Sequence, residues 1–219
     1  MKAKFPNESL EYREARNKLL QAEVELRANI EKVAGMRRAL PLGGEVTKDY
    51  EFYDLDEQRH KLDGLFENHD TLLLYSYMFG PTMSEPCSMC TSILDGLISS
   101  LPSIKNRCSI AIVISGSVDQ AKPIYQNKKW ENLPIYSCQR SEYNRDYLGE
   151  LADGTQIPMM NVFQRKHDKY YHFWGSELVF EPAVGDPRHM DLVWPLWNVL
   201  DLTPQGRGDA YPDLDGMFS

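Results

Sequence analysis

The stretch TLLLYSYMFGPTMSEPCSMCTSILDGLISSL, residues 71–101, decides the fold. It opens with a run, 71–79, that is mostly apolar rather than alternating, which is typical of a strand buried on both faces. A Gly-Pro pair at 80–81 ends that run, and from residue 91 apolar side chains recur at helical spacing. The sequence therefore predicts a buried strand, a polar loop and a helix, with Cys-Ser-Met-Cys (87–90) where the loop meets the helix.

Further elements are expected to follow this unit in alternation. After the first strand and helix, the pattern predicts a second buried strand, another helix, a short strand, a hairpin and a closing helix; their ranges are 108–115, 118–130, 135–137, 159–165 with 170–174, and 190–200. Strands alternating with helices imply parallel crossovers, and a terminal hairpin adds antiparallel strands. The sequence predicts an α/β fold in which helices flank a mixed sheet.

The chain divides into three parts by composition. Residues 1–43 are predicted to form an N-terminal helical extension, because apolar residues recur at steps of three and four from residue 8 to about 34. Residues 44–203 would form the main domain, and 204–219, rich in Pro, Gly and Asp, a C-terminal loop or tail. The long helix either packs along the main domain or joins a partner chain, so a homodimer is one expectation.

Charge and composition exclude several classes of partner. The net charge of -8 repels nucleic acid phosphates and anionic lipid surfaces, and long basic clusters are absent. No run approaches the roughly 18 apolar residues that a membrane-spanning helix needs. The N-terminus lacks the apolar core of a secretory signal, so we expect a cytoplasmic protein. No cofactor, nucleic acid or membrane is expected as a partner.

The two cysteines at the start of the helix carry the predicted chemistry. The first turn of a helix presents unpaired N–H groups and the positive end of the helix dipole, both of which stabilise a thiolate. A cysteine pKa of about 8.5 can fall there to about 7 or lower, and the thiolate is the species that attacks disulfides. We expect Cys87 to be the nucleophile and Cys90, one turn later, to resolve the mixed disulfide.

Zinc binding and inert packing are the competing interpretations of the same thiols. A zinc site would need two more ligands, usually a second close pair of Cys or His. Cys108 and Cys138 stand alone, and the five histidines form no such pair, so no metal is expected. Cys108 and Cys138 are expected to fill the core, as small buried cysteines commonly do.

Three stretches in this order resemble the family known as domain of unknown function 899. They are the lead-in RRALP at 37–41, MFGP at 78–81 followed by the dithiol, and LDLTPQGR at 200–207. That family is described as thioredoxin-like and predicted to consist of dithiol–disulfide oxidoreductases. The resemblance implies a thioredoxin-like fold with Cys87 and Cys90 as the redox-active pair. A disulfide-containing protein or a small-molecule thiol would be the substrate.

Pro158 is a further candidate, by analogy with thioredoxin-like proteins. In those proteins a cis-proline at the start of the equivalent strand faces the dithiol, and X-Pro bonds adopt cis at low cost. Ile157-Pro158 directly precedes the strand expected at 159–165, so we expect a cis bond and a substrate-binding contact at Pro158. The alternative is a proline that simply occupies the first residue of a strand.

Three other functions remain open on the sequence. A peroxiredoxin-like thiol peroxidase is favoured by Ser84, at the right offset from Cys87, but its loop proline is displaced by one residue and its arginine would have to be Arg140 or Arg145. A metal-handling protein of the same fold would need a histidine near the dithiol, for which His172 is the candidate. In a nonenzymatic protein, the N-terminal helix would form a homodimer and the thiols would be idle.

Overall fold

The computed structural model describes residues 4–130, 132–181 and 188–207, and the chain forms two compact units. The first unit is Met1–Pro41 and the second is Leu42–Ser219. Most of the tail predicted at 204–219 lies outside the described residues. Within the described part of the chain, no helix combines the length and the apolar character that crossing a membrane requires.

The first unit is a single long helix, α1, Leu10–Arg38. Ser9 caps it, because the Tyr12 N–H donates to Ser9 Oγ at 3.0 Å. Arg37 and Arg38 lie in its last turn, where positive charge is favourable to the helix dipole. The predicted N-terminal helical extension is confirmed, and it continues four residues beyond the predicted end.

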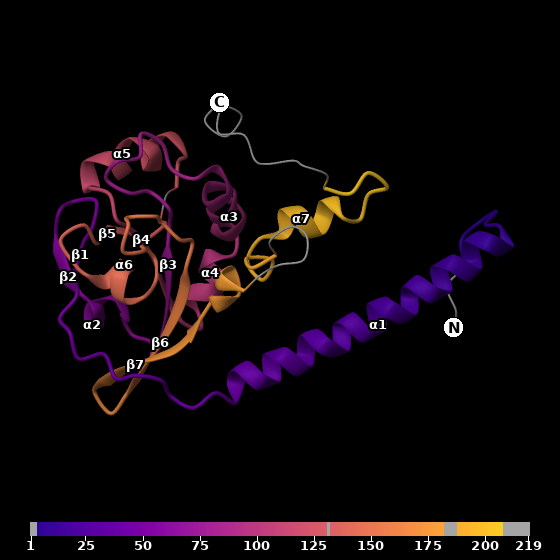
Figure 1. The fold of residues 1–219 in the computed structure, drawn as a ribbon, viewed down its shortest axis with the longest axis horizontal. Coiled ribbons are helices and arrows are strands. Elements are labelled where there is room, and N and C mark those ends of the chain that lie inside the picture. The colour runs from indigo at the N-terminus through magenta and orange to yellow at the C-terminus, as the bar shows by residue number, and fades with distance from the viewer. Residues whose placement is uncertain (1–3, 131, 182–187, 208–219) are drawn as a thin grey trace. The chain divides into compact units, whose positions relative to one another are not determined.

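The second unit is built on a mixed sheet that has seven strands within the described residues, in the order β2-β1-β5-β4-β3-β6-β7 (Figure 1). At its centre β3 pairs in parallel with β4 and antiparallel with β6. The remaining pairs are β4 with β5, which is parallel, and β1 with β2, β1 with β5 and β6 with β7, which are antiparallel. The strands are β1 Glu51–Tyr53, β2 Arg59–Lys61, β3 Thr71–Ser76, β4 Ser109–Ile114, β5 Ile135–Ser137, β6 Met160–Lys166 and β7 Lys169–Gly175.

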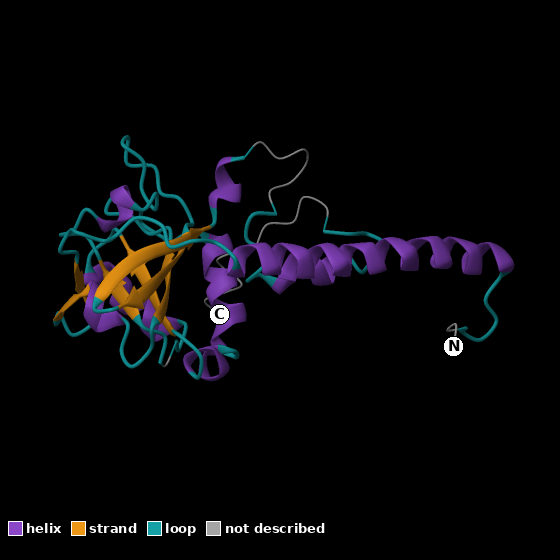
Figure 2. Ribbon diagram, turned by 90° about the horizontal axis from the view of Figure 1, so that it is seen from below, coloured by secondary structure: helices purple, strands orange, loops and turns teal. Residues whose placement is uncertain are grey.

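Helices cover both faces of this sheet (Figure 2). One core layer lies between the sheet and α3, α5 and α7; a second lies between the sheet and the short helices α2 and α6. The helical segments are α2 Leu62–Leu65, α3 Ser88–Ile98, α4 Leu101–Lys105, α5 Val118–Asn127, α6 Tyr143–Asp146, the 3-10 turn η1 Glu177–Phe180 and α7 Pro195–Leu200. The predicted α/β architecture, a mixed sheet flanked by helices, is confirmed.

The central strands bury side chains on both faces, as their apolar runs predicted. In β4, Ile110, Ile112 and Ile114 join the core on the α3 side, while Ala111 and Val113 join the core on the α2 side. Successive side chains of a strand point to opposite faces, so a strand covered twice needs no polar positions. This explains why the strand has no polar and apolar alternation.

The start of the second unit contains structure that the sequence analysis missed. Strands β1 and β2 are three residues each, too short for a periodic pattern. The segment 42–46 runs along β7, with hydrogen bonds from Gly43 N to His172 O at 2.9 Å and from Val46 N to Tyr170 O at 2.8 Å. An added Cβ at Gly43 would lie 2.7 Å from His172 O, so this close approach of two backbones requires glycine.

Ile112 lies at the centre of this packing and offers a test of it. Its side chain is fully buried in β4, and we expect Ile112→Ala to lower the free energy of unfolding by about 2 to 5 kcal/mol, because a cavity replaces buried methyl groups. Leu202→Ala is the matched control, since Leu202 is 84% exposed and its truncation should cost almost nothing. Urea denaturation measures both; an equal effect of the two substitutions would contradict this packing.

Candidate active site

Cys87 occupies the N-cap of α3, directly after the loop that leaves β3. Its backbone N–H donates to Met78 O at 3.0 Å, which ties the start of the helix to the extension of the strand. Its carbonyl accepts the Thr91 N–H at 3.0 Å, the first bond of the helix. The helix begins at Ser88, earlier than the sequence pattern indicated, so Cys90 lies inside the first turn.

A pair of side-chain hydrogen bonds fixes this turn against the strand. The Thr91 hydroxyl donates to Cys87 O at 2.9 Å and is also 2.8 Å from the Tyr77 hydroxyl. Because the single proton of Thr91 goes to the carbonyl, the Tyr77 O–H is the donor in the second bond. Both side chains are buried, so the chain from Tyr77 through Thr91 to Cys87 holds the cysteine in place.

The surroundings of Cys87 favour its thiolate. The Cys90 thiol, by hydrogen bonding to the Cys87 sulfur, lowers the pKa of Cys87 to about 6; burial acts against this, and the backbone N–H groups of Cys90 and Met89 add to it. These N–H groups approach the sulfur without forming a side-chain cap of ordinary geometry. They are the unpaired donors of the helix start, where a thiolate is stabilised.

The pKa of Cys90 is shifted in the opposite direction. It is 1% exposed, and burial together with the neighbouring Cys87 thiolate raises the pKa of Cys90 well above its usual value. All four cysteines lie within the described residues and are free thiols. The pair therefore consists of an accessible, acidic thiol and a buried, protonated one that touch each other.

Three methionines lie close to the dithiol in sequence, and we call them the methionine rim. Met78, Met83 and Met89 are half-buried and pack against the core layer that contains Cys90. Met83 is held by the Gly80 N–H, which donates to its sulfur at 3.2 Å. Methionine is flexible and polarisable and adapts to varied apolar surfaces. The rim of the dithiol is thus apolar and adaptable.

The predicted cis bond at Pro158 is wrong, because the Ile157–Pro158 bond is trans. The chain turns there in another way: the Met159 N–H donates to Ile157 O at 2.8 Å, which closes a three-residue turn around Pro158. Proline suits the centre of such a turn with its fixed φ. Pro158 is half-buried and precedes β6, at the end of the sheet from which the chain leaves β3 toward Cys87.

The side chains that the alternative functions would need are engaged elsewhere. Arg140 stacks on the Tyr53 ring at 4.7 Å, and Arg145 pairs with Glu150 at 3.0 Å. His172 Nε2 lies 3.0 Å from Asn161 Oδ1 and packs on the sheet face opposite Cys90. Across the residues that the structure describes, no three His, Cys, Asp or Glu side chains gather as a metal site would require.

Cys108 and Cys138 lie apart from the dithiol. Cys108 is half-buried and precedes β4, at the opposite end of the strand pair from Cys87. Cys138 follows β5 in the other core layer, where burial raises its pKa to about 12. Its S–H group donates to Ile114 O at 3.2 Å. Neither thiol is placed to exchange with Cys87 or Cys90.

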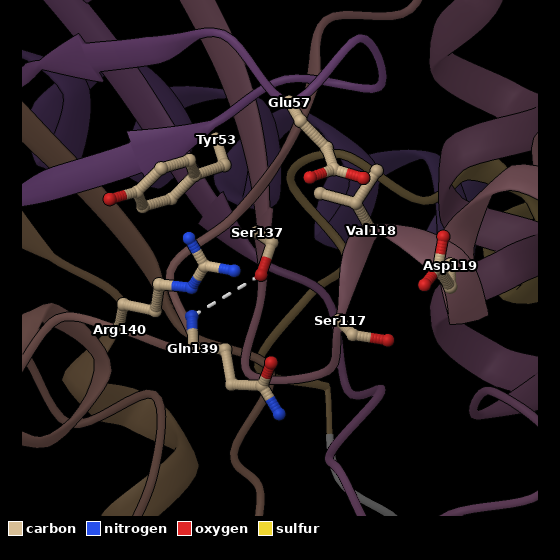
Figure 3. A pocket seen from close by; sticks show the side chains of 8 residues that line it. All are labelled: Tyr53, Glu57, Ser117, Val118, Asp119, Ser137, Gln139 and Arg140. Carbon is tan, nitrogen blue, oxygen red and sulfur yellow. Dashed lines mark hydrogen bonds between the residues drawn. The ribbon is translucent and has the colours of Figure 1, made fainter.

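A separate hollow lies where β5 ends and α5 begins (Figure 3). Its two serine hydroxyls already have backbone partners: Ser137 Oγ donates to Gly116 O at 2.6 Å, and Ser117 Oγ accepts from Gln120 N at 3.2 Å. The lining mixes two carboxylates with one arginine and contains no thiol; its residues are Tyr53, Glu57, Ser117, Val118, Asp119, Ser137, Gln139 and Arg140. This hollow offers no nucleophile, so the dithiol is the better candidate site.

Sequence analysis did not identify the polar groups behind the dithiol. Tyr75, Tyr77 and Thr91 are all buried on the α3 side of the sheet. The signal was present, since two tyrosines two residues apart in an otherwise aliphatic strand point to the same face. That face is the one that the following helix covers.

Comparison with known proteins identifies the family. The pattern of a family described as "Bacterial protein of unknown function (DUF899)" matches residues 1–217. The chain belongs to this family. The predicted resemblance is thus confirmed over almost the whole sequence, while the comparison with curated proteins found no match.

Several solved structures are similar to this chain at low identity. The exposed lipoprotein thioredoxin Etrx1 of Streptococcus pneumoniae strain TIGR4 is 13% identical, covering 66% of this chain and 96% of its own, with a TM-score of 0.44. A peroxiredoxin-like protein of Aquifex aeolicus is 12% identical over 62% and 75% of the two chains, with a TM-score of 0.44. Peroxidoxin BcpB of Mycobacterium tuberculosis is 16% identical over 60% and 82%, with a TM-score of 0.39. At these identities and TM-scores, the solved structures do not indicate which reaction this chain catalyses.

The acidity of Cys87 predicts a pH profile for alkylation. We expect the rate of Cys87 modification by limiting iodoacetamide to be half-maximal near pH 6, because only the thiolate reacts and its pKa is about 6. Peptide mapping by mass spectrometry would measure the rate at each pH. In Cys90→Ala the midpoint should move upward, since the group that most stabilises the thiolate is gone. A wild-type midpoint near 8.5, the value of an ordinary cysteine, would contradict this site.

Proposed function

We propose that this protein is a thiol–disulfide oxidoreductase whose working groups are Cys87 and Cys90. The observation that carries the proposal is the division between the two thiols in direct contact: the pKa of one is lowered and that of the other is raised. Titratable neighbours whose pKa values are pushed apart are typical of sites with assigned chemical roles.

The exchange proceeds in two steps. The Cys87 thiolate attacks one sulfur of a substrate disulfide, so that a mixed disulfide forms and the other substrate thiolate leaves. Cys90 then attacks the Cys87 sulfur, the Cys87–substrate bond breaks, and the Cys90 proton goes to the departing thiol. The protein dithiol is oxidised by two electrons and the substrate disulfide is reduced; the reverse sequence oxidises a substrate dithiol.

Disulfide exchange is supported better than peroxide reduction. A thiol peroxidase of the kind considered above needs a hydroxyl and an arginine at the attacking sulfur. Ser84 is exposed, and Arg140 and Arg145 have other partners. The hydrogen bond between the Cys90 thiol and the Cys87 sulfur, by contrast, supports Cys90 as the group that resolves a mixed disulfide. The apolar methionine rim, with Pro158 at the same end of the sheet, suits a protein or small-molecule disulfide of varied shape.

Substitution of each cysteine separates their roles. We expect Cys87→Ser to abolish reduction of a model disulfide, because the attacking thiolate is lost. Cys90→Ser should accumulate a mixed disulfide at Cys87, visible as a mass adduct that dithiothreitol removes. Cys108→Ser is the matched control and should keep full turnover. Full turnover by Cys87→Ser would show that the dithiol is not the active site.

The acidity of Cys87 also sets an expected reduction potential. A stabilised thiolate favours the reduced form, and a pKa of about 6 falls between the roughly 7 of thioredoxin and the roughly 3.5 of DsbA. We therefore expect the Cys87–Cys90 couple to lie between about -270 and -120 mV, the potentials of those two proteins. Equilibration with glutathione buffers measures it, and a value below -270 mV would contradict the thiolate stabilisation.

A further inference from the structure

The hydroxyl of Tyr75 is a buried polar group that takes no part in the two exchange steps described above. Tyr75 lies in β3 and its exposed fraction is 0%. Within the described part of the chain, its hydroxyl makes no hydrogen bond of ordinary geometry. Buried hydroxyls are normally satisfied, because an unpaired one keeps the full cost of its desolvation. The neighbours of this group indicate why it is retained.

The Tyr75 side chain shares its core layer with Cys90, and the two groups interact through a hydrogen bond and through charge. Burial raises the pKa of Tyr75, and negative charge on Cys90 and then on Cys87 raises it further. For Cys90, burial and the Cys87 thiolate raise the pKa, while the Tyr75 hydroxyl and the Met78 backbone act in the opposite direction. Tyr77 is the other ionisable side chain that acts on Tyr75.

The state of the sulfur decides whether this hydroxyl has a partner. A neutral thiol is a weak hydrogen-bond acceptor, whereas a thiolate is a strong, charged one. Cys90 must become that thiolate at the moment when it attacks the mixed disulfide. The Tyr75 hydroxyl, which makes no hydrogen bond of ordinary geometry in the resting protein, would then form a charged hydrogen bond with the Cys90 sulfur.

We propose that Tyr75 is a positioning residue for the resolving step, donating a hydrogen bond to the Cys90 sulfur as that sulfur takes up negative charge. This inference rests on the proposed disulfide exchange and assigns a role within it. In the step itself, the Cys90–Cys87 bond forms, the Cys87–substrate bond breaks, and the proton of Cys90 leaves with the substrate thiol. Tyr75 keeps its own proton throughout.

Tyr77 has a different task, although it points to the same face of the strand. Its hydroxyl is committed to Thr91 at 2.8 Å, and Thr91 in turn binds the Cys87 carbonyl. Tyr77 therefore holds the start of the helix. Of the two strand tyrosines, only Tyr75 has a hydroxyl free to serve the sulfur of Cys90.

The two steps can be separated with 5,5′-dithiobis(2-nitrobenzoate) as the disulfide. Reduced full-length protein in a Cys108→Ser background, mixed with one equivalent, should release one thionitrobenzoate as Cys87 attacks and a second as Cys90 resolves the adduct. In Tyr75→Phe we expect the first phase to keep its rate and the second to slow about tenfold. The pH at which the second phase reaches half of its maximal rate should rise by about one unit, because a tenfold factor corresponds to one pKa unit.

Tyr143→Phe is the matched control. Tyr143 is equally buried and its hydroxyl is also unpaired, but it lies in the core layer on the opposite side of the sheet. Both phases should be unchanged in this variant. A second phase in Tyr75→Phe as fast as in the wild type, after a normal first phase, would overturn the role of Tyr75 alone. Absence of a Cys87–Cys90 disulfide in the wild-type product would overturn the proposed exchange and this inference together.

Discussion

The hydrogen bond from the Cys87 N–H to the Met78 carbonyl, 3.0 Å long, joins the extension of the central strand to the start of α3. It sets where the helix begins, and so places Cys87 at the N-cap and Cys90 within the first turn. Because β3 is buried on both faces, the strand end is a rigid support. The loop between strand and helix can therefore be long and polar without loosening the dithiol.

Within this turn, Cys87 and Cys90 lie three positions apart and differ in burial. This difference in burial shifts the pKa values of the two thiols in opposite directions. The helix start exposes Cys87 to the loop and to unpaired N–H groups, whereas the same helical turn drives Cys90 into the core layer with Ile93 and Leu94. Desolvation penalises the charged form of the buried sulfur, and the contact between the sulfurs stabilises the charge on the outer one. The asymmetry thus follows from one helix terminus packed on one sheet.

The same packing explains why the other candidate ligands and bases do not converge on the dithiol. A bulge between β6 and β7 at Val162 and Phe163 puts Trp174 on the side of the dithiol and His172 on the other. Arg140 and Arg145 follow β5, where an aromatic ring and a carboxylate hold them. The polar groups close to the dithiol are instead tyrosine and threonine hydroxyls, which hydrogen-bond without adding charge.

The sequence by itself determined the α/β class, the central strands and the position of the dithiol between strand and helix. Apolar runs and periodicity are local properties, and burial on both faces shows directly in residues such as Ile110 to Ile114. It did not determine β1, β2 or the helix start at Ser88, since these depend on backbone partners elsewhere in the chain. The cis bond expected at Pro158 came from analogy with other proteins, and the bond is trans. Only the tertiary structure decided that Tyr75 shares a core layer with Cys90 and that His172 does not, because the face on which a side chain lies depends on register, bulges and the helix packed above it.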